Sequence, residues 1–249
     1  MTMPGKLYGV GTGPGDPELL TLKAVRAMGE AQVIAHFAKQ GRAGNAQKIV
    51  AAHVRPDQTL LPLYYPVTTE LDKDQDDYRG AIAGFFDEAA ARVAAELAAG
   101  RTVAVLSEGD PFFYGSYMHL HLRLAHRFDT EVVPGVTAMS GCWSAAGLPL
   151  MQGDDVTSVL PGTLGETELS RRLADTDAAI IMKVGRNLPK IRRALAAAGR
   201  LDGAVYVERG TMAEAKVVPL AAAGEIAAPY FSIVLVPGWR ARPKAEAAE

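Results

Sequence analysis

The sequence predicts an α/β fold made of two halves of similar size. Apolar runs typical of buried strands alternate with amphipathic runs typical of helices, and such alternation favours mostly parallel strands. Each half holds five strand-like runs. The length of 249 residues is too great for one small core and short for three domains. We therefore expect two α/β domains, residues 1–136 and 137–249.

The first half is predicted to contain five strands and four helices. The strands are expected at residues 6–11, 32–37, 59–64, 102–107 and 131–134. The helices are expected at residues 18–28, 45–54, 78–99 and 116–128. Asp16 and Pro17 suit the N-cap and first position of the first helix, and Asn45 suits the N-cap of the second. Gly100 is expected to end the third helix.

The second half begins with a run of small residues at 137–146 that favours a helix. Strands are expected at residues 156–160, 178–183, 205–208, 216–220 and 232–236. Further helices are expected near residues 166–173 and 188–198. The last residues, 241–249, are polar and rich in Ala and Glu, so we expect them to fray.

Composition excludes several classes of protein. The net charge of -2 gives no field that would attract nucleic acid or an anionic membrane. No apolar run reaches the length of a membrane span, and no signal peptide is recognisable. Cys142 is the only cysteine, which fits the cytosol, and we expect it to be buried and inert. Neither HExxH nor CxxC occurs, so no metal site is expected.

A glycine-rich turn follows the first predicted strand. Its glycines occupy every second position: Gly9, Gly11, Gly13 and Gly15. The dinucleotide spacing fails, because Pro14 or Asp16 stands where its third glycine should be, and no P-loop Lys follows. Pro14 has no N–H to offer a phosphate, and Asp16 would repel one. Either a tight turn without a ligand or a neutral or cationic ligand remains open.

Five stretches, taken together and in order, resemble the tetrapyrrole methylase family. They are residues 9–22 (GVGTGPGDPELLTL), 107–115 (SEGDPFFYG), 133–138 (VPGVTA), 181–187 (IMKVGRN) and 206–211 (YVERGT). Longer runs look most like the cobalamin-pathway branch that methylates carbon 20 of precorrin-2. These runs are SEGDPFFYGSYMHL, PGVTAMSGCW, LPGTL and MKVGRNLPKIRRAL.

The resemblance implies two α/β domains, with a parallel five-stranded first sheet, a mixed five-stranded second sheet and S-adenosylmethionine in the cleft between the domains. It implies methyl transfer to precorrin-2, giving precorrin-3A and S-adenosylhomocysteine, by a cytoplasmic homodimer. Carried over residue by residue, the cofactor site consists of Pro14, Glu108, Gly109, Asp110, Phe112, Thr137, Ala138, Met182, Lys183, Val207 and Ser232. A cobalt-containing factor II, another tetrapyrrole, or a non-catalytic tetrapyrrole- or nucleotide-binding role remain alternatives.

Asp110 follows a buried strand, where ligands gather in α/β sheets, although an Asp before Pro is also an ordinary turn residue. Asp110 and Lys183 are candidates for accepting the proton that the methylated ring releases, and water is a third. An aromatic cluster beside Asp110 could pack in the core or form a wall for a flat macrocycle. The residues expected to face the substrate are Phe113, Tyr114, Tyr117, Tyr230 and Arg186.

Precorrin-2 is rich in carboxylates, so its site needs cations. Residues 178–201 carry six cations and no Asp or Glu. Arg suits bidentate recognition of carboxylates. Lys183 and Arg186, at a predicted strand end, are the better candidates, whereas Arg192 and Arg193 suit the solvated face of the following helix.

Overall fold

The computed structural model describes residues 3–66, 76–224 and 227–238. The chain divides into two compact units, Met1–Thr137 and Ala138–Glu249. Each unit is built on one five-stranded sheet, so the predicted α/β class is confirmed. The predicted fraying at residues 241–249 lies outside the described residues. Across the described ranges, no helix has the length and apolarity needed to cross a membrane.

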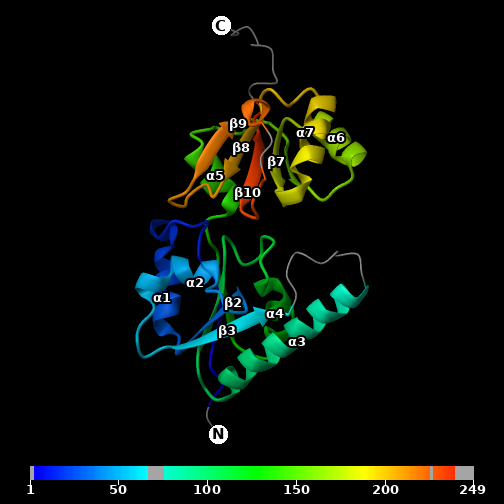
Figure 1. Cartoon of the computed structure of the whole chain (residues 1–249). Coiled ribbons are helices and arrows are strands. Elements are labelled where there is room, and N and C mark those ends of the chain that lie inside the picture. The colour runs from blue at the N-terminus through cyan, green and yellow to red at the C-terminus, as the bar shows by residue number, and fades with distance from the viewer. Residues whose placement is uncertain (1–2, 67–75, 225–226, 239–249) are drawn as a thin grey trace. The chain divides into compact units, whose positions relative to one another are not determined.

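The first unit carries a parallel sheet with the strand order β3-β2-β4-β1-β5. Figure 1 labels β2, β3 and the helices α1 to α4 of this unit. Its strands are β1 (Leu7–Gly11), β2 (Val33–Lys39), β3 (Thr59–Tyr65), β4 (Val103–Ser107) and β5 (Thr130–Val133). Its helices are α1 (Leu22–Glu30), α2 (Asn45–Ile49), α3 (Asp76–Ala98) and α4 (Tyr117–Leu124), with 3-10 turns at Pro17–Leu19 and Ala51–His53. The expectation of a parallel first sheet is confirmed.

Helices cover both faces of this sheet, as a parallel sheet requires. On one face, Leu7 and Val105 pack with the apolar sides of α3 and α4. On the other face, Val10 and Leu106 pack with α1 and α2. Strands β1 and β4 are therefore buried at every position. This explains why the two strands read as unbroken apolar runs and places their carboxyl ends at the centre of the sheet edge.

The continuous helix predicted at residues 18–28 is wrong. Asp16 caps only the 3-10 turn Pro17–Leu19, accepting from the Glu18 N–H at 2.9 Å. Leu20 is then extended, with φ −66° and ψ 134°. Helix α1 begins afresh at Leu22, because Thr21 Oγ1 accepts from the Ala24 N–H at 3.0 Å and provides a second N-cap. The prediction overlooked this second capping residue.

The predicted helix at residues 45–54 also divides in two. Helix α2 ends at Ile49, and the 3-10 turn Ala51–His53 follows. Asn45 is not its cap. Gly44 occupies the N-cap position, and the Asn45 side chain is directed to Glu108 instead.

The second unit carries a mixed sheet with the strand order β6-β7-β10-β8-β9. Its strands are β6 (Thr157–Pro161), β7 (Ala178–Met182), β8 (Val205–Glu208), β9 (Lys216–Pro219) and β10 (Ser232–Val236). Its helices are α5 (Ala138–Ala145), α6 (Glu166–Ala174) and α7 (Leu188–Ala197), with 3-10 turns at Gly185–Asn187 and Leu220–Ala222. Among the five described strands, β6 and β7 pair in parallel and the other three pairs are antiparallel, so the expected mixed sheet is confirmed.

Two cores form on the opposite faces of this sheet. Helices α6 and α7 cover one face through residues such as Leu169 and Ile191. Helix α5 covers the other face, and Cys142 is its buried residue in that core. Cys142 is buried as expected, and desolvation raises the pKa of its thiol to about 11.

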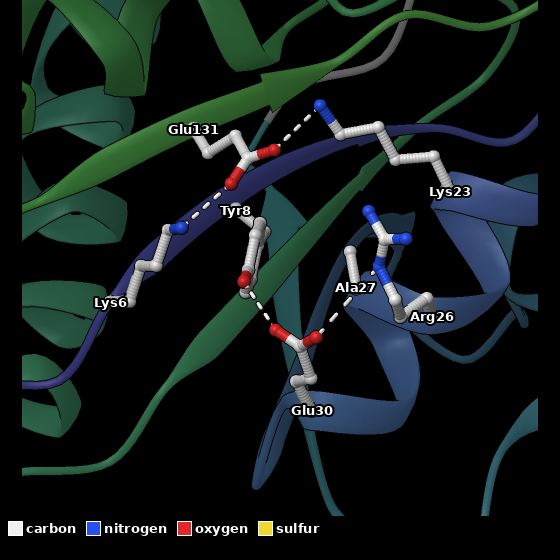
Figure 2. Close-up of a pocket in the computed structure, with 7 residues that line it drawn as sticks. All are labelled: Lys6, Tyr8, Lys23, Arg26, Ala27, Glu30 and Glu131. Carbon is white, nitrogen blue, oxygen red and sulfur yellow. Dashed lines mark hydrogen bonds and ion pairs between the residues drawn. The ribbon is translucent and has the colours of Figure 1, made fainter.

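A cavity of about 290 Å³ lies between α1 and the amino ends of β1 and β5 (Figure 2). It is lined by Lys6, Tyr8, Lys23, Arg26, Ala27, Glu30 and Glu131. The Glu131 carboxylate accepts from Lys6 Nζ and Lys23 Nζ, each at 2.6 Å. The Tyr8 hydroxyl donates to Glu30. Both carboxylates thus have partners within the protein, and the cluster ties α1 to the sheet.

This cluster predicts a pH-dependent contribution to stability. Hydrogen bonds from Lys23 and Lys6 lower the pKa of Glu131 to about 2, against an ordinary value of 4.5. Because the folded-state pKa is depressed, the contribution is fully present above pH 4.5 and is lost as the pH falls towards 2. We expect Glu131→Gln to lower the melting temperature at neutral pH, and the difference from the wild type to shrink in acid.

Thermal unfolding followed by circular dichroism at a series of pH values measures this difference. High salt, about 1 M, should reduce it too, since the Debye length is then about 3 Å. A difference that stays constant between neutral pH and acid would contradict the ion-pair explanation.

Candidate functional site

Loops from three neighbouring strands meet at the carboxyl edge of the first sheet. Because β1 pairs with β4, the turn after Gly11 lies beside the turn after Ser107. The two turns are joined by a small ladder, in which the Gly109 N–H donates to Gly13 O at 2.8 Å and the Gly13 N–H donates to Gly109 O at 3.3 Å. Gly13 and Gly109 adopt φ values of 74° and 65°, where a side chain would be strained.

The third loop approaches so closely that only glycine fits. A Cβ on Gly135, just after β5, would lie 2.1 Å from Gly109 O. A Cβ on Gly11 would lie 2.6 Å from Gly135 N. Strand β1 lies between β4 and β5, so its glycine-rich end forms the floor on which the other two loops meet. We call this arrangement of Gly11, Gly13, Gly109 and Gly135 the glycine junction.

Asp110 holds two of these loops together. Its Oδ1 accepts from the Phe112 N–H at 2.8 Å, and its Oδ2 accepts from the Gly135 N–H at 3.1 Å. Both carboxylate oxygens therefore have backbone donors. This geometry favours a positioning role at the glycine junction over the role of proton acceptor.

Glu108 comes two residues before Asp110, and protein atoms surround its carboxyl although part of the residue reaches solvent. Desolvation raises the pKa of its carboxyl, while hydrogen bonds from the Asn45 side chain and the Ala46 N–H act in the opposite direction. These bonds connect the loop after β4 to the start of α2. Asn45 thus lies at the carboxyl edge of the first sheet, where the sequence did not predict it. A polar residue at the start of a helix instead predicts an N-cap.

The aromatic residues after Asp110 divide into two groups. Phe112 and Tyr114 are each 48% exposed, and Phe113 packs edge-on against Tyr114 with ring centroids 5.0 Å apart. Tyr117 is fully buried. A Cβ on Gly9 would lie 2.2 Å from its ring. Gly9 therefore makes room for the Tyr117 ring. Tyr117 packs in the core and does not face a substrate as expected.

The second unit brings its predicted cofactor residues to one edge of its own sheet. Met182 ends β7, Val207 lies near the end of β8, and Ser232 begins β10, which runs antiparallel to both strands. Ser232 pairs with Glu208 in the ladder, and its hydroxyl donates to Pro229 O at 2.5 Å. Val207 is buried with Cys142. We call this edge the second-sheet edge.

Other predicted residues lie near these loops. Lys183 and Arg186 are exposed in the segment that follows β7, and Asn187 Nδ2 donates to Lys183 O at 3.1 Å. Tyr230, before β10, is 72% exposed. Pro14 is partly exposed in the first glycine-rich turn. Thr137 ends the first unit, and Ala138 begins α5.

The six cations of residues 178–201 do not act as one cluster. Arg193 pairs with Glu166 at 2.7 Å on the outside of α7. Arg192 donates to Leu220 O at 2.7 Å. Arg200 donates to the carbonyls that precede β7, including Thr176 O at 2.9 Å. These arginines hold the second unit together, and Lys190 Nζ donates to Asn187 Oδ1 at 3.3 Å. Lys183 and Arg186 differ from them in lying directly after β7, at the second-sheet edge.

Residues 6–226 match the family Tetrapyrrole (Corrin/Porphyrin) Methylases, and the chain belongs to this family. A precorrin-2 C(20)-methyltransferase of Sinorhizobium sp is 70% identical to it over 96% of this chain and 98% of that protein. A cobalt-precorrin-2 C(20)-methyltransferase of Salmonella typhimurium is 29% identical over 84% of this chain and 86% of that protein. The family resemblance drawn from the motifs is therefore confirmed.

Two solved structures confirm the predicted fold. A cobalt precorrin-4 methyltransferase of cobalamin biosynthesis superposes with a TM-score of 0.70, 22% identity and coverage of 96% of each chain. The uroporphyrin-III C-methyltransferase of Thermus thermophilus, complexed with S-adenosylhomocysteine, superposes with a TM-score of 0.66 and 26% identity. That comparison covers 94% of this chain and 92% of the Thermus chain.

Proposed function

We propose that this protein transfers a methyl group from S-adenosylmethionine to carbon 20 of precorrin-2, giving precorrin-3A and S-adenosylhomocysteine. The observation that carries the proposal is the 70% identity to a precorrin-2 C(20)-methyltransferase across nearly the whole length of both chains. We further propose that the protein is cytoplasmic, as its single cysteine suits, and acts as a homodimer, as family resemblance implies.

The residues at the two sheet edges fit this cofactor chemically. The glycine junction holds three loops together at the carboxyl edge of the first sheet, and Pro14 and Asp16 make its first turn unsuited to a phosphate. S-adenosylmethionine supplies a methyl group already activated by a positively charged sulfur. We propose that the cofactor is held by Pro14, Glu108, Gly109, Asp110, Phe112, Thr137, Ala138, Met182, Lys183, Val207 and Ser232.

The protein's own contribution to the reaction is alignment and recognition. Holding donor and acceptor in line can supply about 7–11 kcal/mol of the barrier reduction. We propose that Phe113, Tyr114 and Tyr230 face the flat ring, since Tyr114 and Tyr230 expose much of their surface. Arg186 would bind a ring carboxylate. For the released proton, water is the first candidate, because Asp110 already accepts two backbone hydrogen bonds and Lys183 could accept a proton only as the neutral amine.

A cobalt-bearing ring is the second candidate substrate. The relative named for cobalt-precorrin-2 is 29% identical to this chain, against 70% for the relative named for precorrin-2. We therefore favour metal-free precorrin-2.

The decisive experiment is a methyl-transfer assay. The purified protein should convert precorrin-2 and S-adenosylmethionine into a product one methyl group heavier, placed on carbon 20 by mass and NMR. Cobalt factor II should react more slowly, and uroporphyrinogen should not react. Binding of both ligands without any methylated product would favour the non-catalytic alternative.

Cofactor preference gives a separate test. Calorimetry should show binding of S-adenosylhomocysteine, whereas NAD and ATP should not bind, because the glycine-rich turn lacks both phosphate-binding spacings. Tight NAD binding would contradict the proposed cofactor.

A further inference from the structure

Among the described residues, three that are not glycine adopt a positive φ: Tyr114 at 56°, Lys183 at 56° and Arg209 at 48°. This left-handed conformation is unfavourable for residues with a Cβ and tends to persist where function requires it. Each of the three lies in a loop after the carboxyl end of a strand, namely β4, β7 and β8. Tyr114 and Lys183 are already candidate site residues, which directs attention to Arg209.

The backbone around Arg209 is firmly held. Its N–H donates to Phe231 O at 2.9 Å, which extends the β8–β10 ladder by one residue. Its own carbonyl accepts from the Met212 N–H at 2.8 Å, which closes a turn. The left-handed conformation is thus imposed from both sides and fixes where the side chain leaves the second-sheet edge.

The guanidinium of Arg209 is oriented but not enclosed. Its Nη1 donates to Glu208 Oε1 at 3.2 Å, and the Tyr206 hydroxyl donates to Glu208 Oε2 at 3.0 Å. The Glu208 side chain is 16% exposed, whereas that of Arg209 is 39% exposed. Glu208 therefore orients the guanidinium through a single hydrogen bond to Nη1. A planar guanidinium has five N–H donors, so donors remain for a ligand.

Arg209 and Lys183 flank the same strand. Strand β10 lies between β7 and β8, and Lys183 directly follows β7 as Arg209 directly follows β8. Neighbouring strands are about 4.8 Å apart, so the two chain positions are separated by about 10 Å. Arg186 extends the Lys183 side of this pair. The second-sheet edge thus presents cations on both sides of β10, a spacing suited to two separate carboxylates.

We propose that Arg209 binds a carboxylate side chain of the tetrapyrrole, with Glu208 as its positioning residue, and so helps to select polycarboxylate rings. The proposal rests on the proposed function, because it assigns a further contact to that substrate. It accounts for an arginine in a conformation that glycine would adopt at lower cost.

The test compares Arg209→Gly and Arg209→Lys with the wild type in the full-length protein. Glycine suits the left-handed backbone, so Arg209→Gly should keep or raise the melting temperature. Its KM for precorrin-2 should rise about tenfold, as expected for one charge-assisted hydrogen bond at a half-exposed cation. Affinity for S-adenosylhomocysteine should not change. Arg209→Lys keeps the charge without the planar donors, so its KM should be intermediate.

Arg193→Ala is the matched control, since it removes an exposed, ion-paired arginine of the same unit; its KM should stay at the wild-type value. An unchanged KM in Arg209→Gly would overturn the proposal. A lowered melting temperature in the same variant would then show that the Arg209–Glu208 ion pair only stabilises the fold.

Fluorescence titration with uroporphyrin, a stable polycarboxylate ring, gives a readout independent of turnover. A wild-type protein that binds uroporphyrin but does not methylate precorrin-2 would refute the proposed function. In that case, weaker uroporphyrin binding by Arg209→Gly would still support the role of Arg209 in carboxylate binding.

Discussion

Asp110→Asn should reduce turnover by about tenfold to a thousandfold, since the loss of one placed polar group from a site costs up to about a thousandfold. The carboxylate accepts from two backbone N–H groups, on Phe112 and Gly135. An asparagine side chain has only one oxygen, so its NH₂ group would face one of these donors. The glycine junction should then open on one side, and the loops proposed to hold the cofactor should shift.

The same hydrogen bonds mean that stability should fall as well. Losing a hydrogen bond to a charged group costs about 1.5–3 kcal/mol, so the melting temperature should drop by several degrees. The measurements are kcat per folded molecule, the affinity for S-adenosylhomocysteine and the melting temperature. Asp57→Asn is the control, because it alters an exposed, ion-paired carboxylate of the same unit. A destabilised Asp110→Asn with an unchanged rate per folded molecule would make Asp110 an ordinary turn residue.

Arg186→Ala should raise the KM for precorrin-2 by about tenfold to a hundredfold. A ring carboxylate that leaves water needs a fixed donor in exchange, and one charge-assisted hydrogen bond contributes about 1.5–3 kcal/mol. Arg186 is exposed in the 3-10 turn Gly185–Asn187 that follows β7. The affinity for S-adenosylhomocysteine should remain at the wild-type value, because the lost contact belongs to the other ligand.

Arg193→Ala provides the matched comparison here too, since Arg193 is already paired with Glu166 on the outside of α7. Its effect on KM should be small. Added salt should lower the precorrin-2 affinity of the wild type more than that of the Arg186→Ala variant. The variant already lacks one ion pair with the substrate, so salt has one interaction fewer to screen. Wild-type substrate binding in Arg186→Ala would show that Arg186 is only a solvated surface residue.

The strands were the easiest part of the fold to predict. Short apolar runs bounded by glycine, proline and polar residues mark them strongly, and the predicted residues 205–208 and 232–236 coincide with β8 and β10. Helix starts were harder, because Asp16 and Thr21 both suit an N-cap and the sequence does not show which of them starts the longer helix. Strand order could not be predicted, since it depends on crossovers between distant segments.

The candidate site was predictable as motifs but not as contacts. The alternating glycines indicated close backbone approach at the first turn. However, the partner that presses against Gly11 is Gly135, far away in the sequence, and it is reached only because β1 pairs with both β4 and β5. Tyr117 shows the opposite limit. An aromatic residue at a helix start suits either a ligand wall or a core, and only its burial against Gly9 decides.

Because all five strands of the first sheet lie before Thr137, each unit is built from one unbroken stretch of chain. During synthesis from the amino terminus, the first unit therefore leaves the ribosome with every strand of its sheet present. Residues 138–249 take roughly 6 to 22 seconds more at about 5–20 residues per second. We therefore expect the glycine junction to form on the nascent chain before synthesis of the second unit is complete.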